Sequence, residues 1–198
     1  MNPWQITYPD MRFAVLAVDP PWLFGDRLPN DSLTTARGAS DNYRCMTVDE
    51  LKQMPLPEML PDATLFMWRV SAMVEEAYSI VRAWGFTQKA EVVWLKRTKH
   101  GKRHFGMGRT VRMEHESCII ATRGRPQTLS KSVRSTFEAQ VGQHSEKPEE
   151  FYAIVEQLRA GPYCELFARR LRAGWTCLGD GVTSELDTDD GLSRVSLP

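Results

Sequence analysis

Four consecutive residues, Asp19-Pro20-Pro21-Trp22, have groups suited to holding a planar heterocycle. Proline fixes φ and has no N–H donor, so we expect the backbone carbonyls of this segment to stay free to accept hydrogen bonds. The carboxylate of Asp19 adds a further acceptor, and Trp22 adds a flat apolar surface. This combination suits an aromatic ring with an exocyclic amine, whose two N–H groups would donate to the acceptors.

The same arrangement would activate such an amine. An amine on an aromatic ring is a weak nucleophile, because its lone pair is delocalised into the ring. Two acceptors would favour a pyramidal nitrogen that can attack an electrophilic methyl group in line. A nucleic-acid base reaches such a site only when it is single-stranded or flipped from a duplex, and stacking on Trp22 would return about 1–3 kcal/mol of that cost. The alternative is structural: a turn that ends a strand, followed by a core tryptophan.

The elements predicted around this segment are those of an α/β protein. Residues 13–18 form a short apolar run that ends at Asp19, which is typical of a buried strand stopped by prolines. Strands alternating with helices indicate a sheet covered by helices on both faces. In such sheets ligands bind beyond the carboxyl ends of the strands. Further strands are predicted at residues 63–70, 91–96, 117–122, 133–136, 165–168 and 175–178.

Three helices are predicted from capping signals and apolar spacing. Thr47 and Glu50 have the spacing of a capping box. Ser71 is expected to cap a second helix, which stops at Gly85. Pro148 lies at the first turn of a third helix, where proline is favoured.

Length and composition fit one globular domain. The 198 residues are 42% apolar and 25% charged, which is ordinary for such a protein. There is no apolar run long enough for a membrane span and no recognisable signal peptide, so we expect a cytoplasmic protein. Residues 1–182 are predicted to form the domain, with a long polar loop at residues 23–45. Residues 183–198 form an acidic tail that we expect to be disordered.

The cysteines, at positions 45, 118, 164 and 177, form no CxxC pair. We expect them to be reduced, buried thiols. A zinc site would have to use His100, His104, His115 and Cys118, and these residues lack a second ligand pair at finger spacing. No metal is therefore predicted.

Residues 96–112 contain seven lysines and arginines and no acidic residue, although the chain as a whole has 25 basic and 25 acidic residues. Phenylalanine and histidine are interleaved with them. A basic loop with aromatic side chains suits the phosphates and unstacked bases of nucleic acid. Lys99, Lys102, Arg103 and Arg109 are the candidate contacts. The alternative is a solvated charged loop.

A strand followed by Asp-Pro-Pro-Trp resembles the amino-methyltransferases, which methylate exocyclic amines of nucleic-acid bases with S-adenosylmethionine. The chain is similar to one family among them, the MT-A family of the 70-kilodalton catalytic subunit of the mRNA adenosine-N6 methyltransferase. The resemblance extends over about residues 13–182 and implies a Rossmann-like methyltransferase sheet and N6 methylation of adenine. Besides Asp-Pro-Pro-Trp, it depends on the ordered occurrence of residues 43–51, 65–68, 84–86, 94–96, 108–109, 115–118, 144–148, 165–169 and 175.

The resemblance also implies how S-adenosylmethionine is held, since no glycine-rich nucleotide loop follows the first strand. Lys147 would pair with the methionine carboxylate, where a helix N-terminus adds positive potential. Arg169, at the end of a strand, would contact the ribose region, and Asp180 would lie near the cofactor tail. The chain departs from the family here: many relatives have Asn at the position of Asp180, and the nuclear enzymes have a His-Asn pair near Leu171 and Arg172.

For the substrate, our hypothesis is that Asp19 and the Pro20 carbonyl hold the amine and that Trp22 stacks on the base. Tyr43 matches a flexible segment that closes over the base, and Glu116 matches an acidic position near the site. Short members of the family are typically prokaryotic or phage-borne and resemble DNA adenine methyltransferases. DNA is therefore favoured over RNA.

Two other functions stay open at this point. One is a non-catalytic nucleic-acid-binding partner subunit of the same fold, and the other is a methyltransferase acting on the N4 amine of cytosine. The intact Asp-Pro-Pro-Trp together with Lys147 favours a catalytic chain, because a degenerate partner usually loses one or both. Relatives pair through the face near the basic loop, so a homodimer or paired subunit is a further expectation.

Overall fold

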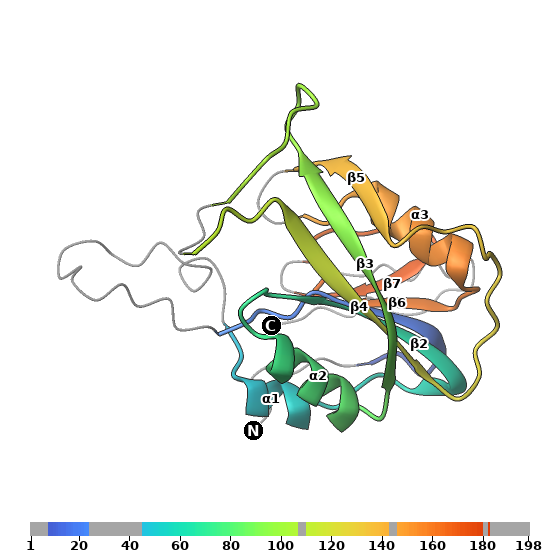
Figure 1. Ribbon diagram of the computed structural model, residues 1–198. Coiled ribbons are helices and arrows are strands. Elements are labelled where there is room, and N and C mark those ends of the chain that lie inside the picture. The colour runs from blue at the N-terminus through green and yellow to red at the C-terminus, as the bar shows by residue number, and fades with distance from the viewer. Residues whose placement is uncertain (1–7, 24–44, 107–109, 143–145, 180–181, 183–198) are drawn as a thin grey trace.

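The computed structural model describes residues 8–23, 45–106, 110–142, 146–179 and 182. Within these ranges the chain forms a seven-stranded sheet with helices on both faces (Figure 1). The strands are β1 (Phe13–Val18), β2 (Met59–Arg69), β3 (Thr87–Arg97), β4 (His115–Arg123), β5 (Thr136–Gln140), β6 (Tyr163–Leu166) and β7 (Trp175–Leu178). The helices are α1 (Val48–Gln53), α2 (Val74–Ala83) and α3 (Glu149–Leu158).

The strand order, β5-β3-β4-β2-β1-β6-β7, decides which residues meet. Strand β4 runs antiparallel to β2 and β3, and every other neighbouring pair is parallel. Six strands therefore end at the same edge of the sheet, where β4 begins. We call this the carboxyl edge. Side chains just after β1, near the end of β3 and at the start of β4 come together there.

The sheet has an apolar core on each face. Leu16 and Val18 of β1 pack with α1 and α2 on one face, whereas Val15 and Ala17 pack with α3 on the other. A strand covered on both sides has no polar face, which explains why the β1 sequence is a continuous apolar run. The predicted fold class is therefore confirmed.

Local signals predicted some element boundaries correctly and others wrongly. The capping box of Thr47 and Glu50 is present at α1. Ser71, however, is not the cap of α2. The helix begins at Val74, with Met73 at the N-cap and no side-chain cap bond. The strand predicted at 133–136 lies instead at Thr136–Gln140, where it pairs with β3.

Three further findings concern expectations about the whole chain. No helix among the described residues is long and apolar enough to cross a membrane. All four cysteines are free, and three of them are buried, whereas Cys45 is only half-buried. The predicted tail at 183–198 and most of the predicted loop at 23–45 lie outside the described residues.

Candidate active site at the carboxyl edge

Four charged side chains form a continuous chain of ion pairs at the carboxyl edge. Lys147 Nζ lies 2.8 Å from Asp19 Oδ2 and 3.1 Å from Glu116 Oε2. Lys96 Nζ lies 2.5 Å from the other oxygen of Glu116. We call Asp19, Lys147, Glu116 and Lys96 the charge quartet. Its two carboxylates and two ammonium groups alternate, so its net charge is zero.

The sheet topology brings these four residues together. Asp19 directly follows β1, and Glu116 is the second residue of β4, opposite Trp94 of β3. Lys96 lies two residues beyond Trp94 on β3, and therefore on the same face. Lys147 comes just before Pro148, the N-cap of α3.

A pair of tryptophans lies under the quartet. Lys147 Nζ is 5.0 Å from the ring centroid of Trp68, and Lys96 Nζ is 5.4 Å from that of Trp94. The two rings meet edge to face, with centroids 6.4 Å apart. Each ammonium group thus has an aromatic face and a carboxylate as neighbours, and both interactions favour the charged form. The tryptophans also exclude water from one side of the ion pairs, because both are buried.

These neighbours control protonation in the quartet. Burial alone would raise the pKa of Glu116, but Lys147 and Lys96 outweigh it and hold the pKa below its ordinary value. Burial likewise disfavours the charged form of Lys147, yet Asp19 and Glu116 raise the pKa of Lys147 well above its ordinary value. Both groups are therefore ionised at neutral pH, and Lys147 is a permanent cation beside Asp19.

A small pocket opens beside the quartet. It brings together Asp19, Lys147 and Arg169, three of the residues singled out from the sequence. Arg169 reaches it from the turn after β6, because that strand ends at Leu166 rather than at Ala168 as predicted. The full lining is Asp19, Glu146, Lys147, Tyr152, Glu165, Phe167, Arg169 and Arg170.

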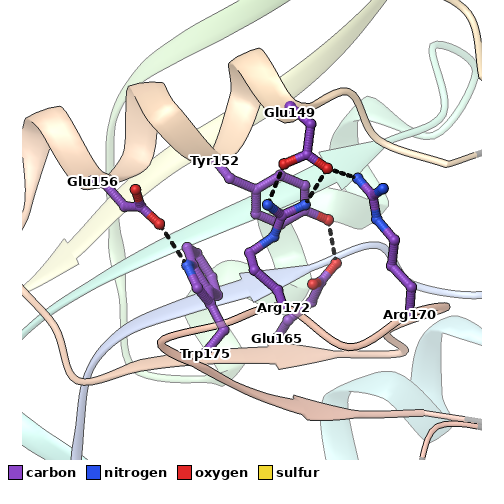
Figure 2. A network of polar contacts seen from close by, with 7 residues as sticks. All are labelled: Glu149, Tyr152, Glu156, Glu165, Arg170, Arg172 and Trp175. Atoms are coloured by element: carbon purple, nitrogen blue, oxygen red, sulfur yellow. Dashed lines mark hydrogen bonds and ion pairs between the residues drawn. The ribbon is translucent and has the colours of Figure 1, made fainter.

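One wall of the pocket is a buried acid that the sequence did not single out. Tyr152 donates a 2.7 Å hydrogen bond to Glu165 Oε1, and both residues are buried (Figure 2). Burial raises the pKa of Glu165, although Tyr152 and Arg172 act in the opposite direction. Glu165 is a polar residue within a strand of only four residues, and nothing in the sequence indicates that it lines a pocket. Its importance becomes visible only when Tyr152 of α3 lies over it.

The backbone of Asp19-Pro20-Pro21-Trp22 differs from the prediction in one respect. Its carbonyls are not free, because Pro20 accepts a 2.8 Å hydrogen bond from Trp22 N–H and Pro21 accepts one of 2.8 Å from Met46 N–H. A carbonyl oxygen has two lone pairs, so each can still accept a second bond. Trp22 is only 5% exposed and packs in the core with Met46, as in the structural alternative. The Trp22 ring anchors the segment that contains Asp19.

A strained turn shapes the far side of the pocket. Phe167, just after β6, has a φ of 60°, which is rare for a residue other than glycine. Gly179, just after β7, lies so close to this turn that a Cβ atom there would be 2.1 Å from the Ala168 carbonyl oxygen. Only glycine fits at position 179 for this reason.

The basic segment, residues 96–112, is less positive than its sequence suggests. Acidic residues from its own return strand and from β5 face it: Lys96 pairs with Glu116, Arg97 with Glu138 and Arg103 with Glu114. Lys99 and Lys102 are exposed and make no ion pair with described residues. The local positive charge is therefore concentrated at the tip of the segment.

Some candidates cannot be placed. Tyr43, Arg109 and Asp180 lie outside the described residues. Among the described residues, no group of three or more His, Cys, Asp or Glu side chains converges as a metal site would require. Cys118, considered as a zinc ligand, is fully buried in the core beside Trp68 and Trp94.

The mostly parallel sheet, the helices on both faces and the charged pocket at the carboxyl edge define a Rossmann-like methyltransferase fold. Comparison with protein families identifies which one. The MT-A70 family profile matches residues 13–181, and the chain belongs to the MT-A70 family.

Individual relatives agree with this assignment. The human N(6)-adenosine-methyltransferase catalytic subunit METTL3 is 30% identical over 181 residues, which cover 86% of this chain and 29% of that protein. An N(6)-adenosine-methyltransferase MT-A70-like protein of Arabidopsis thaliana is 28% identical over 186 residues, covering 91% of this chain and 25% of that protein. The chain thus spans less than a third of the length of these relatives. The type II methyltransferase M.MunI of a Mycoplasma species is 26% identical over 197 residues, which cover 88% of this chain and 81% of that protein.

Proposed function

We propose that this chain transfers a methyl group from S-adenosylmethionine to the exocyclic N6 amine of adenine in nucleic acid. The observation that carries the proposal is the ion pair of Asp19 with the buried Lys147 at the mouth of the pocket, in a chain of the MT-A70 family. The relatives named above as N(6)-adenosine methyltransferases support adenine as the base.

The pocket fits the charges of S-adenosylmethionine, which carries a carboxylate, an ammonium group and ribose hydroxyls. Lys147 would pair with the carboxylate, and Arg169 would contact the ribose region. Asp19 and Glu165 would supply hydrogen-bond acceptors. When bound, the cofactor supplies a methyl group on a positively charged sulfur. Asp180 would complete the site near the cofactor tail.

In the mechanism that we propose, Asp19 accepts one N–H of the amine and the second lone pair of the Pro20 carbonyl accepts the other. The ion pair with Lys147 orients the Asp19 carboxylate as a hydrogen-bond acceptor. Trp22 holds the segment in register from the core, and base stacking by its ring requires the side chain to become exposed. After methyl transfer, Asp19 would accept the proton that the methylated nitrogen loses and pass it to solvent.

We further propose DNA as the preferred polymer. The preference rests on the resemblance of the sequence to short prokaryotic DNA adenine methyltransferases, and the similarity to the type II methyltransferase M.MunI over 81% of that protein supports it. Lys99, Lys102, Arg103 and Arg109 would contact the phosphates, with Tyr43 and Glu116 close to the base. Pairing of two copies near the basic segment, and a cytoplasmic location, also remain proposals.

The deciding experiment is a methyl-transfer assay with labelled S-adenosylmethionine and separate single-stranded DNA, double-stranded DNA and RNA substrates. The products are digested and the nucleosides identified by mass spectrometry. We expect N6-methyladenine, mainly in DNA. N4-methylcytosine as the product would show that the target base is cytosine and not adenine. The absence of any product on all substrates, together with intact nucleic-acid binding, would favour a non-catalytic subunit.

The variant that tests the role of Asp19 in this mechanism is Asp19→Ala. Turnover should fall about 100-fold or more, as when one hydrogen-bonding group is removed from a transition state, while S-adenosylmethionine binding is retained. Methylation by Asp19→Ala at the wild-type rate would contradict the mechanism.

A further inference from the structure

A cluster of arginines after β6 lies outside the charge quartet. Arg170 and Arg172 converge on the carboxylate of Glu149, the first residue of α3 (Figure 2). Arg170 donates to Oε1, and Arg172 donates to both oxygens, with its Nη2 3.0 Å from Oε1. Two guanidinium groups that grip one carboxylate have the charge and the fork geometry that a phosphate oxyanion needs.

Arg172 has a second support besides Glu149. The Arg172 Cζ atom lies 3.4 Å from the ring centroid of Tyr152, and the side chain is only 14% exposed. Tyr152 is itself fixed by its hydrogen bond to Glu165. The guanidinium group is therefore already positioned for an anion.

Glu149 is the exposed partner in this site. Its side chain is 60% exposed, and that of Arg170 is 40% exposed, so the Glu149–Arg170 pair contributes little to stability. Arg172 is only 14% exposed and needs an anion in place of Glu149, which a phosphate would supply. Another anion can therefore take the place of the carboxylate by a side-chain rotation.

The arginines and the basic segment lie on opposite sides of Asp19. Arg170 lines the same pocket as Asp19, and it follows β6, the neighbour of β1 on one side. The basic segment joins β3 to β4, and β4 lies two strands from β1 on the other side. With neighbouring strands about 4.8 Å apart, the two basic regions bracket the pocket across about 15 Å. A nucleic-acid strand whose base reaches Asp19 carries phosphates on both sides of that base.

We propose that Arg170 and Arg172 bind a backbone phosphate of the nucleic acid next to the target base, and that this phosphate displaces Glu149. The inference rests on the proposed function, because it names a further contact of the same substrate. A phosphodiester carries one negative charge, as Glu149 does, so the exchange leaves the charge at the arginines unchanged. It also releases counterions from the nucleic acid, which favours binding.

The test compares Glu149→Gln with Arg170→Ala. Affinity for a fluorescently labelled single-stranded DNA oligonucleotide is measured by anisotropy, between about 50 and 200 mM salt. Glu149→Gln removes the competitor, and we expect binding about threefold tighter or more with a steeper salt dependence. Arg170→Ala should bind more weakly, with a log–log salt slope shallower by about 0.7, the value for one phosphate on a single strand. Arg82→Ala, an exposed arginine of α2 on the opposite face of the sheet, should match wild type.

The opposite directions of the two effects exclude a purely structural role, because loss of a structural clamp would weaken binding in both variants. The inference is overturned if Glu149→Gln binds no more tightly than wild type, or if Arg170→Ala keeps the wild-type slope. Loss of S-adenosylmethionine affinity in Arg170→Ala, with the slope unchanged, would assign the arginines to the cofactor and also overturn it. Failure of wild type to bind any nucleic acid would instead contradict the proposed function itself.

Thermal melting of each variant checks folding. If Arg170→Ala melts early, Arg170→Lys replaces it, since lysine keeps the charge and loses the fork. That variant should retain the salt slope and bind more weakly. Affinity equal to wild type in Arg170→Lys would contradict the role of the fork.

Discussion

Lys147 is the residue on which the candidate site depends most. Its side chain is 8% exposed and has carboxylates on two sides, from Asp19 and Glu116. Removing an ammonium group from water costs several kcal/mol, and only close ion pairs with good geometry offset that cost. The two carboxylates therefore make the buried lysine tolerable, and the lysine in turn allows two acids to stand close together in their charged forms.

Replacing Lys147 should destabilise the protein, because it removes the ion-pair partner of Asp19. In Lys147→Met, Asp19 loses its partner and faces Glu116 without an intervening charge. We expect the free energy of unfolding to fall by about 2 kcal/mol, below the roughly 3–5 kcal/mol of a fully buried pair, because Asp19 is partly exposed. Urea denaturation measures the change. The double variant Lys147→Met/Asp19→Asn should recover part of the loss, since the unpaired charge is then gone.

A control separates this effect from the loss of any lysine in the quartet. Lys96→Met leaves Glu116 paired with Lys147, and Lys96 is 20% exposed. Its cost should be within about 1 kcal/mol. Equal losses for Lys147→Met and Lys96→Met, or no recovery in the double variant, would show that burial of charge does not govern the site.

Among the elements, α1 shows what a local signal can and cannot do. Thr47 accepts from Glu50 N–H, and the Glu50 carboxylate accepts a 2.8 Å bond from Thr47 N–H, so the cap is closed in both directions. The helix has only six residues, too few to be stable alone. Tertiary packing completes it: Leu51 is fully buried, and its carbonyl accepts a 2.8 Å hydrogen bond from Trp84 Nε1 at the end of α2.

Two substitutions at helix starts should therefore differ. Thr47→Ala removes a real cap, and we expect a loss of about 1 kcal/mol, which lowers the melting temperature by about 2–4 °C. Ser71→Ala should change nothing measurable, because α2 begins after Met73 and Ser71 is exposed. Scanning calorimetry of both variants tests this. A loss on Ser71→Ala equal to that on Thr47→Ala would mean that Ser71 does cap α2.

At the scale of the molecule, the chain has no net charge, but the exposed tip of the basic segment is positive. Counts of 25 basic and 25 acidic residues give no net charge. Three of the basic side chains in residues 96–112 are paired with Glu114, Glu116 or Glu138. Lys99 and Lys102, exposed at the tip, are therefore the cations that the proposed contact with phosphates would use.

Reversing these charges should weaken nucleic-acid binding uniformly across sequences. We expect Lys99→Glu and Lys102→Glu each to make the log–log salt slope shallower by about 1. Arg103→Glu should add repulsion from its partner Glu114 and reduce stability as well. Lys89→Glu is the control, because Lys89 is exposed on β3 near the opposite edge of the sheet. An unchanged slope in both lysine variants would remove the basic segment from the binding surface.

Features that depend on neighbouring residues in the chain could be predicted from the sequence. Strand β1 ends at Val18 because an Asp-Pro-Pro turn follows it, the cap of α1 lies at Thr47, and β7 occupies residues 175–178 as predicted. The same local signals placed Asp19 at the end of a strand and Lys147 just before a helix. Each of these features follows from φ restriction, capping or apolar spacing within a few residues.

Which of these residues meet depends on the packing of the sheet and could not be predicted from local signals. Lys147 pairs with Asp19 and Glu116 because β1, β2 and β4 are neighbours in the sheet. Glu138 of β5 reduces the charge of the basic segment for the same reason. Strand order also buried Trp22 and brought Gly179 against the Phe167 turn. Ion pairing and burial depend on distances between segments far apart in the chain, and the packing of the sheet sets those distances.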